Sequence, residues 1–269
     1  SGTEATMDAI RLARGVTKRE KLVKVEGGYH GHHDEVMISN KPAIADAGPA
    51  DAPWSIPQSA GITQGTIDDV IVIPFNDAPA LERALASREV ACFIVEPVME
   101  NIGICLPEPG YLEAVREICT KYGTLLIFDE VKTGITAGLG GATKKLGVTP
   151  DLITLAKSIG GGFPVGAFGG KAEYMNLITT GEVLHLGTYN GNPLVMAAAK
   201  ATLTEACTPE AIDRAIALNH RLVEACQKII DDAGLPAHTV EFGAKGCITW
   251  SIAPVRNYRD YKATEFDLA

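Results

Sequence analysis

Three ionisable residues each directly follow a run of mostly apolar residues in this sequence. They are Glu96, Asp129 and Lys157. Apolar runs of this kind are typical of strands that are buried on both faces of a parallel sheet. The carboxyl ends of parallel strands meet at one edge of the sheet, and ligands bind there. We therefore expect the three side chains to share one crevice.

A lysine at such an edge can carry out covalent chemistry. Desolvation or a cationic neighbour lowers the pKa of a lysine, which then attacks a carbonyl and forms a Schiff base. Pyridoxal phosphate (PLP) chemistry needs that lysine, a carboxylate at the pyridinium nitrogen and an anion site for the phosphate. Lys157 suits the first role. Asp129 suits the second, because it would keep the ring nitrogen protonated, so that the ring accepts the electron pair left when Cα loses its proton.

The start of the chain suits the phosphate. Ser1, Gly2 and Thr3 precede the first predicted helix. Backbone N–H groups and hydroxyls at a helix N-terminus favour an anion. The same three residues are also a common way to begin a helix, so an N-cap without further function stays open here.

Strands and helices must alternate to bring these residues together. We predict strands at Lys21–Val25, Val70–Ile73, Ala91–Val95, Thr124–Phe128, Leu152–Ala156 and Val165–Phe168. We predict helices at Thr3–Arg14, ended by Gly15, and at Ala78–Ala86, Pro109–Tyr122, Pro193–Ala206 and Pro209–Ala233. Residues 38–66 read as a long loop, and Pro236–Ile252 as a small antiparallel pair. The alternation indicates an α/β fold with a mainly parallel sheet that is covered on both faces.

The composition argues against some classes of binding partner. The formal net charge is −9, from 24 Lys and Arg against 33 Asp and Glu, which argues against nucleic acid and anionic membranes. No apolar run approaches the roughly 20 residues of a membrane span. The 6 cysteines include no CxxC pair, so we expect free thiols and a cytoplasmic protein. His32 and His33 beside Asp34 read as solvated loop residues, and we expect no metal.

Both ends of the chain lack the usual signals. It opens on Ser1 without an initiator Met, and residues 265–269 show no clear stop. We therefore expect an excerpt of a longer protein.

A set of motifs in a fixed order matches a known family. The motifs are Ser1-Gly2-Thr3-Glu4-Ala5, Gly28-Tyr29-His30-Gly31-His32, Glu96-Pro97-Val98, Phe128-Asp129-Glu130-Val131, the stretch Leu155 to Gly162 around Lys157, and the stretch Gly187 to Pro193 around Thr188. From Ser1 to about Tyr261 the chain resembles the class III aminotransferases of PLP fold type I. It looks most similar to their glutamate-1-semialdehyde aminomutase branch.

The resemblance implies an architecture. It implies a mostly parallel seven-stranded sheet in a three-layer α/β/α arrangement. Residues 1–205 would be the large PLP-binding domain without its N-terminal segment. Residues 206–269 would begin a truncated small C-terminal α+β domain.

The resemblance also implies roles at the cofactor. Lys157 would carry PLP and move the proton between Cα and the cofactor, and Asp129 would pair with the pyridinium nitrogen. Val131 and Tyr29 would cover the two faces of the ring. Ser1, Gly2 and Thr3 would hold the phosphate.

Four further residues follow from the same motifs. Glu96 and Asn101 match positions near the phenolic oxygen of the cofactor, and for Glu96 a structural role in tying down loops stays open. His30 would support the site from behind. Thr188 would reach the phosphate of the neighbouring subunit, which implies a homodimer with shared sites.

Three functions stay open at this point. The first is an aminotransferase that moves an amino group from an amine or amino acid to a keto acid or aldehyde by a ping-pong mechanism. The second is glutamate-1-semialdehyde 2,1-aminomutase, although Ile38–Ala43 lacks the Ser-Gly signature of that branch's gating loop. The third is a truncated, non-catalytic PLP-fold module. A nicotinamide site is a poor fit, because no GxGxxG follows the first strand.

Overall fold

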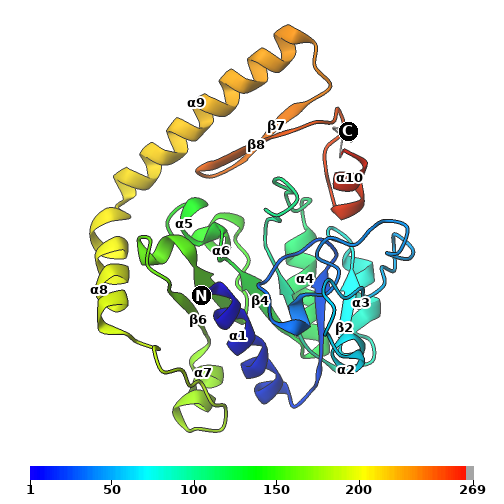
Figure 1. Ribbon diagram of the computed structural model, residues 1–269, viewed down its shortest axis with the longest axis vertical. Helices are drawn as coiled ribbons and strands as arrows, with labels where there is room; N and C mark the ends of the chain where they lie inside the picture. Colours follow the sequence, from blue (N-terminus) through cyan, green and yellow to red (C-terminus); the bar gives the residue numbers. More distant parts are fainter. Residues whose placement is uncertain (265–269) are drawn as a thin grey trace.

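A six-stranded sheet organises the chain (Figure 1). The computed structural model describes residues 1–264; residues 265–269, on which the expectation about the C-terminal end rests, lie outside this range. The strands are β1 (Lys21–Val25), β2 (Val70–Ile73), β3 (Val90–Val95), β4 (Leu125–Asp129), β5 (Leu152–Ala156) and β6 (Gly166–Gly170). Their order is β2-β1-β3-β4-β5-β6. The pairs from β2 to β5 are parallel, and β6 runs antiparallel to β5.

The sheet has one strand fewer than the resemblance implies. All six predicted strands pair within it, whereas β7 (His238–Phe242) and β8 (Lys245–Thr249) pair only with each other among the described residues. The predicted antiparallel pair in Pro236–Ile252 is therefore confirmed as a separate hairpin.

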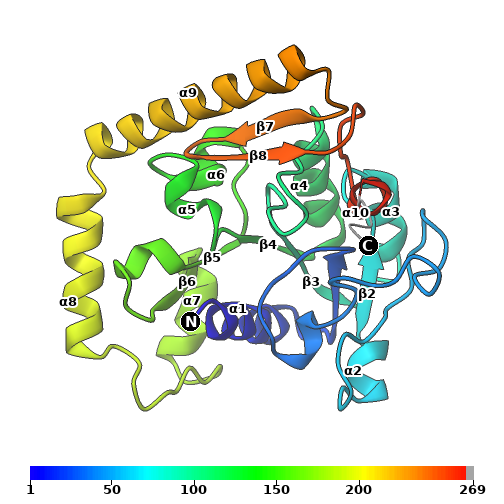
Figure 2. The same cartoon turned by 45° about the horizontal axis from the view of Figure 1, so that its top comes forward.

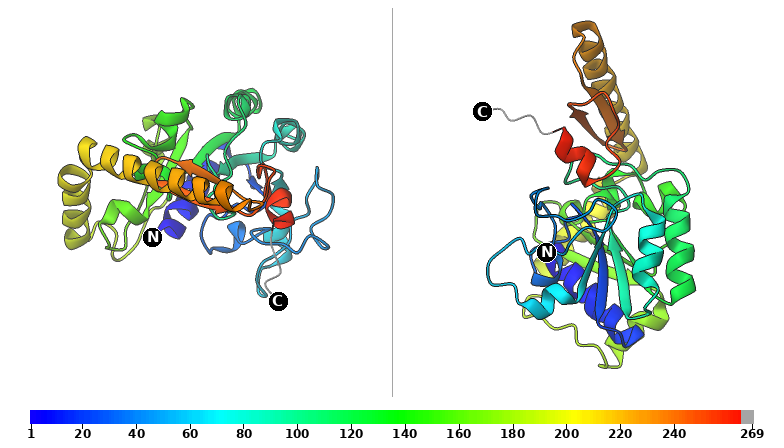
Figure 3. Two further views of the ribbon diagram at one scale, coloured as in Figure 1. Left: turned by 90° about the horizontal axis from the view of Figure 1, so that it is seen from above. Right: turned by 90° about the vertical axis from the view of Figure 1, so that its right-hand side faces the viewer.

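Helices cover both faces of the sheet. They are α1 (Gly2–Thr17), α2 (Gln64–Asp68), α3 (Ala78–Leu85), α4 (Tyr111–Tyr122), α5 (Thr133–Thr136), α6 (Gly141–Leu146), α7 (Ala172–Thr179), α8 (Pro193–Ala201), α9 (Pro209–Ala233) and α10 (Tyr258–Ala263). Short 3-10 turns lie at Asp34–Val36 and Lys157–Gly160. Helices α3 and α4 pack on one face, and α1 and α7 on the other, as the right-hand view of Figure 3 shows for α1, α3 and α4. The predicted three-layer α/β/α arrangement is confirmed.

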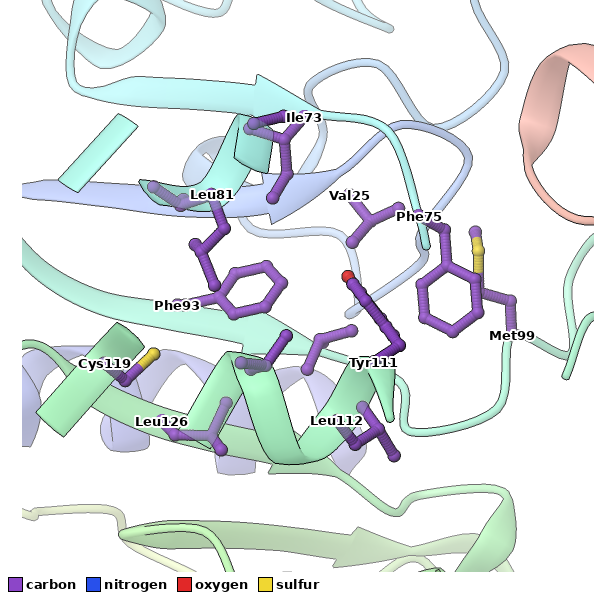
Figure 4. Close-up of a cluster of buried hydrophobic side chains, with 14 of the residues drawn as sticks. Val25, Ile73, Phe75, Leu81, Phe93, Met99, Tyr111, Leu112, Cys119 and Leu126 are labelled. Atoms are coloured by element: carbon purple, nitrogen blue, oxygen red, sulfur yellow. The ribbon is translucent and has the colours of Figure 1, made fainter. Parts of the chain in front are cut away.

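Strand β3 shows how one sequence serves two cores. Phe93 and Val95 point into the cluster beneath α3 and α4, where Tyr111 and Phe75 stack edge to face (Figure 4). Cys92 and Ile94, one position out of phase, belong to the cluster beneath α1. Successive strand residues point to opposite faces, so an unbroken apolar run fills both layers.

Helix α1 continues past the glycine that was predicted to end it. It ends at Thr17, with Lys18 in the left-handed conformation at φ 56°. Gly15 lies inside the helix, where an added Cβ would come within 2.5 Å of the Val183 side chain. Gly15 is therefore a close-packing position and not a cap, so this prediction was wrong.

Two other helix boundaries differ slightly from the prediction. Helix α4 begins at Tyr111, after Gly110 at φ 82°, and not at Pro109. The helix predicted at Pro193–Ala206 is α8 followed by a π-helical turn at Thr202–Ala206.

The C-terminal elements form an arm that returns to the sheet. Helix α9 runs along one side of the β7–β8 hairpin (Figure 2), and α10 comes back to the segments that follow β1. Arg259 on α10 makes a two-pronged ion pair with buried Glu26, with both N···O distances 2.8 Å. The Tyr258 hydroxyl donates to the Pro42 carbonyl oxygen. Glu26 directly follows β1, so the arm is fastened next to the loop that carries Tyr29 and His30. Among residues 1–264, every helix is too short or too polar to cross a membrane.

Candidate active site

A pocket opens where β3, β4 and β5 end. Its lining residues are Gly2, Thr3, Tyr29, His30, Gly31, Glu96, Asp129, Val131, Lys132 and Lys157. The three ionisable residues at the strand ends therefore lie around one cavity, as the parallel-sheet argument expects. Most of the predicted site residues are here. Ser1, Asn101 and Thr188 do not line this pocket.

Asp129 is held firmly at the floor of the pocket. Its Oδ1 accepts hydrogen bonds from the Val131 backbone N–H at 3.0 Å and from the Thr154 hydroxyl at 3.2 Å. His30 Nδ1 lies 2.8 Å from Asp129 Oδ2, and the side chain of Asp129 is 4% exposed. These hydrogen bonds fix the orientation of the Asp129 carboxylate.

The partners of His30 indicate its tautomer. The imidazole is fully buried, and its Nε2 has no hydrogen-bond partner among the described residues. A proton on Nε2 would be a buried donor without an acceptor, which is costly. We therefore assign the proton to Nδ1, which then donates to Asp129. In this state His30 orients the Asp129 carboxylate.

Lys157 combines backbone strain with a free amine. It begins the turn after β5 with φ 49°, a left-handed conformation that is rare for residues other than glycine. Strained residues of this kind cluster at functional sites. Within residues 1–264 its Nζ has no hydrogen-bond or ion-pair partner, and the residue is exposed to the open pocket. The amine is therefore available to a ligand.

Glu96 ties two loops to the pocket. It accepts hydrogen bonds from the Tyr29 backbone N–H at 3.1 Å, the Glu100 backbone N–H at 3.2 Å and the Asn101 side-chain amide at 3.0 Å. Burial raises the pKa of Glu96 above its ordinary value. The structural role that sequence analysis left open for Glu96 is thus visible in its contacts. Asn101 acts through Glu96 and lies behind the pocket wall.

The N-terminus of α1 forms a close-packed corner of the pocket. A Cβ on Gly2 would lie 3.1 Å from both methyl groups of Val131. Gly31, at φ 109°, crosses so close to Thr3 that a Cβ there would lie 2.7 Å from the Thr3 hydroxyl. Ser1, the N-cap residue of α1, does not line the pocket. Free backbone N–H groups of the first helical turn therefore face the cavity beside Thr3.

Tyr29 and Val131 flank the space between Asp129 and Lys157. The Tyr29 backbone is held by Glu96, while 43% of the residue is exposed. An aromatic ring fixed through its backbone and open to a cavity can stack on a planar ligand. Val131 lies two residues after Asp129, and its methyl groups pack against Gly2 of helix α1.

Thr188 lies in an exposed apolar segment. Leu184, Leu186 and Tyr189 surround it in sequence, and they are 61%, 81% and 81% exposed. Thr188 therefore has no contact with the pocket of its own chain. His185 joins this segment to α1, with Nδ1 2.8 Å from Asp8 Oδ2.

Three residues around the site were not found by sequence reasoning. Thr154 holds Asp129, and Lys132 lines the pocket. Lys24 is fully buried on β1 and donates to the carbonyl oxygens of Gly28 at 3.0 Å and Ile38 at 2.6 Å. Burial lowers the pKa of Lys24 to about 7. Lys132 directly follows the Asp129-to-Val131 motif, and this adjacency was the available signal.

The histidine pair after Gly31 differs from its prediction at one position. His33 is not a solvated loop residue, because its side chain is only 10% exposed. Its Nδ1 lies 3.0 Å from Glu35 Oε2, and its Nε2 lies 3.3 Å from the Thr6 hydroxyl. His32 is exposed, as predicted.

Comparison with known proteins agrees with this geometry. The family model described as "Aminotransferase class-III" matches residues 1–240. A curated relative, glutamate-1-semialdehyde 2,1-aminomutase 2 of Brevibacillus brevis, is 43% identical over 270 residues, which cover 99% of this chain and 61% of the relative.

Solved structures are similar along the whole chain. An omega-transaminase from Sphaerobacter thermophilus is 37% identical with a TM-score of 0.92, covering 100% of this chain and 61% of that one. A glutamate-1-semialdehyde aminomutase from Pseudomonas aeruginosa PAO1, in complex with PMP, is 27% identical with a TM-score of 0.86, covering 99% of this chain and 59% of that one. The chain therefore spans about three fifths of the length of these relatives.

Proposed function

Because this chain belongs to the class III aminotransferases, a family of PLP-dependent enzymes, we propose that it transfers an amino group from an amine or amino acid to a keto acid or aldehyde. The observation that carries the proposal is the unpartnered Lys157 amine in the same pocket as the fixed Asp129 carboxylate. These two groups can bind a pyridine ring from opposite sides. The chemistry of this donor set matches the needs of the family's cofactor.

The pocket fits PLP at each of its functional groups. Lys157 would hold the cofactor covalently, and Asp129 would face its ring nitrogen. Tyr29 and Val131 would cover the two ring faces. The small residue Gly2 leaves room at the helix N-terminus, where the backbone N–H groups and the helix dipole favour a phosphate.

The bound cofactor would supply an electron sink for the pair released when substrate Cα loses its proton. In our proposal the residues of the chain do the rest. Lys157 Nζ takes the proton from Cα and returns it to the cofactor side. Asp129, oriented by His30, keeps a proton on the ring nitrogen. Tyr29 and Val131 keep the ring flat and shield it from water. A second carbonyl substrate reverses the steps, which gives ping-pong kinetics.

The test is the substitution Lys157→Ala. We expect the PLP-loaded protein to lose its visible absorption band and its turnover of amine donors. Lys171→Ala is a control, since Lys171 lies at the opposite edge of the sheet, where it pairs with Asp151 just before β5. Undiminished activity in Lys157→Ala would refute the proposal.

The aminomutase reaction is the second candidate. It is favoured by the 43% identity to a curated aminomutase. In that reaction the substrate keeps its nitrogen and no second substrate is consumed. Product analysis with glutamate-1-semialdehyde as the sole substrate separates the two reactions: formation of 5-aminolevulinate at a rate matching that of transamination would favour the mutase.

The contacts of Ile38–Ala43 support the transaminase. Lys24 Nζ donates to the Ile38 carbonyl and to Asn40 Oδ1, and Ser39 accepts from the Gly27 backbone N–H. The Pro42 carbonyl accepts from the Tyr258 hydroxyl. The segment that would have to serve as the aminomutase gate is thus tied down at successive residues.

We further propose a homodimer in which Thr188 reaches the phosphate bound by the partner subunit. The exposure of Thr188 and of the apolar residues around it supports this arrangement. We also propose that a large domain at residues 1–205 carries the cofactor and that residues 206–269 begin a small domain. The 6 cysteines, free in the described chain, support a reducing, cytoplasmic location.

A further inference from the structure

Lys132 brings a second lysine side chain to the pocket. It lines the cavity together with Lys157, Asp129 and Glu96. Its Nζ donates to the Glu100 carbonyl oxygen at 2.5 Å and to Asn101 Oδ1 at 2.7 Å. Both contacts come from the loop after β3, so the ammonium is held in a defined place against the pocket wall.

The positive charge of Lys132 is not neutralised by a direct ion pair. Both oxygens that accept its hydrogen bonds belong to uncharged groups, and the described residues contain no carboxylate within salt-bridge distance of its Nζ. The Glu100 carboxylate, whose backbone carbonyl accepts from Lys132, is 3% exposed and pairs with Lys245 of β8 at 2.5 Å. Lys245 also donates to the Lys132 carbonyl oxygen at 3.1 Å. Lys245 of the hairpin therefore pairs with the Glu100 carboxylate, which could otherwise pair with Lys132.

We propose that Lys132 sets the protonation of the site: its ammonium lowers the pH at which the Lys157 nitrogen, once joined to the cofactor, loses its proton. The inference rests on the proposed function, because it presupposes that Lys157 carries PLP. The physical reason is Coulomb repulsion between two positive charges in a partly desolvated cavity, where screening by water is weak. Burial lowers the pKa of Lys132.

The other titratable groups around the cavity form the electrostatic surroundings in which Lys132 acts. They are Glu96 after β3, Asp129 at the end of β4, His30 in the loop after β1, Glu100 in the loop after β3 and Lys245 on β8. Asp129 and Glu96 favour a positive Lys157 nitrogen. Asp129 is committed to His30 and Thr154, and Glu100 to Lys245. The positive charge of Lys132 therefore opposes the effect of these carboxylates on the Lys157 nitrogen.

This charge would serve the reaction. A substrate amine attacks only in its unprotonated form, and an unprotonated Lys157 nitrogen can accept the proton that the amine must lose. Removing Lys132 should move this step to higher pH. We expect the loss to show as a shifted pH profile and not as a uniform loss of rate.

The experiment is a spectroscopic pH titration of the PLP-loaded protein without substrate. We expect Lys132→Met to raise the pH midpoint of the visible absorption change by about one unit. Lys132→Gln, which can still donate to Glu100 and Asn101, should give the same shift, because it also lacks the charge. Lys132→Arg should stay near the wild-type midpoint. A wild-type midpoint in both neutral variants would overturn the inference, even with binding and fold intact.

Two controls keep the outcome specific. Lys121→Met removes an equal charge from an exposed pair with Glu82 on the outer helices and should leave the midpoint unchanged. Lys157→Ala separates the inference from the proposed function. If that variant keeps the wild-type visible band, the proposed function fails; if it loses the band and the Lys132 variants titrate like wild type, only the inference fails.

Discussion

The site residues could be predicted where an ionisable residue directly follows an apolar strand. Glu96, Asp129 and Lys157 could be placed together, because the ends of parallel strands share an edge. The contacts that orient them could not be predicted. His30 meets Asp129 across 99 positions of the chain, and Thr154 meets it from the neighbouring strand. Such pairings depend on how the loop after β1 folds over the sheet, which no local pattern encodes.

Asp129 gives a direct prediction at this scale. Asp129→Asn keeps the shape and can keep the Thr154 contact, but it removes the charge that holds a proton on the ring nitrogen. We expect turnover to fall about 10²–10³-fold while PLP still binds, measured by steady-state kinetics beside a binding titration. Asp151→Asn is the matched control. It removes a buried carboxylate that pairs with Arg116 and Lys171, so it should lower stability without this loss of turnover. Equal losses of turnover in both variants would contradict the role of Asp129.

The strands and the longer helices were predictable from periodicity and their ends less so, whereas the short helices α2, α5, α6, α7 and α10 were not predicted. Strand β5 and helix α9 have the predicted bounds. An apolar run marks the strand, and Pro209 and Gly234 mark the two ends of the helix, so both signals are local. Gly15 was misread, since a glycine near a helix end has the same local pattern whether it caps or packs. Only the position of Val183, far along the chain, decides between the two.

Substitution of Gly15 tests this contact, because its effect on the free energy of unfolding should change sign when the Val183 side chain is removed. Gly15→Ala should lower the free energy of unfolding by about 1 kcal/mol, because overpacking against Val183 exceeds the gain in helix propensity. In a Val183→Ala background the clash is gone, and the same substitution should raise the free energy of unfolding. Urea unfolding of the four proteins measures both effects. A stabilising Gly15→Ala in the otherwise wild-type chain would show that the close contact is absent.

Glu35 links the loop after β1 to α1 and gives a pH dependence. The hydrogen bond from His33, with the ion pair to Arg14, lowers the pKa of Glu35 to about 2 from 4.5. A lowered carboxyl pKa stabilises the fold above the unfolded value and loses that contribution as pH falls from 4.5 toward 2. We expect Glu35→Gln to lower the free energy of unfolding by about 1–2 kcal/mol at pH 7. Denaturant unfolding should show this gap closing on acidification; a gap independent of pH would contradict the ion pair.

At the scale of the whole molecule, helix α9 and the β7–β8 hairpin of the C-terminal arm were predicted, whereas α10 and the contacts of the arm were not. Arg259 reaches Glu26 over 233 positions, and Lys245 reaches Glu100 over 145. Both contacts end on loops that border the pocket. Charged residues on exposed elements have many possible partners in a sequence, so these pairings emerge only once the sheet and the arm are placed together.

The exposed apolar segment around Thr188 predicts an assembly. Leu186 and Tyr189 are each 81% exposed, which is unfavourable in water unless another surface covers them. We expect a dimer by sedimentation analysis and a shift toward monomer in Leu186→Asp and Tyr189→Asp. Ile252→Asp is the control, because Ile252 is 85% exposed but lies after the hairpin, away from this segment. A monomeric wild-type protein, or dissociation by Ile252→Asp alone, would contradict the proposed interface.

Chemical trapping of the cofactor tests the proposed role of Lys157 most directly. The pocket contains two lysines, Lys157 and Lys132, and only Lys157 is free of hydrogen-bond partners within the described chain. The PLP-loaded protein should be reduced with borohydride, digested and mapped by mass spectrometry. We expect the phosphopyridoxyl mass on Lys157, with Lys132 unmodified. A label on Lys132, or no label on either lysine, would contradict that role.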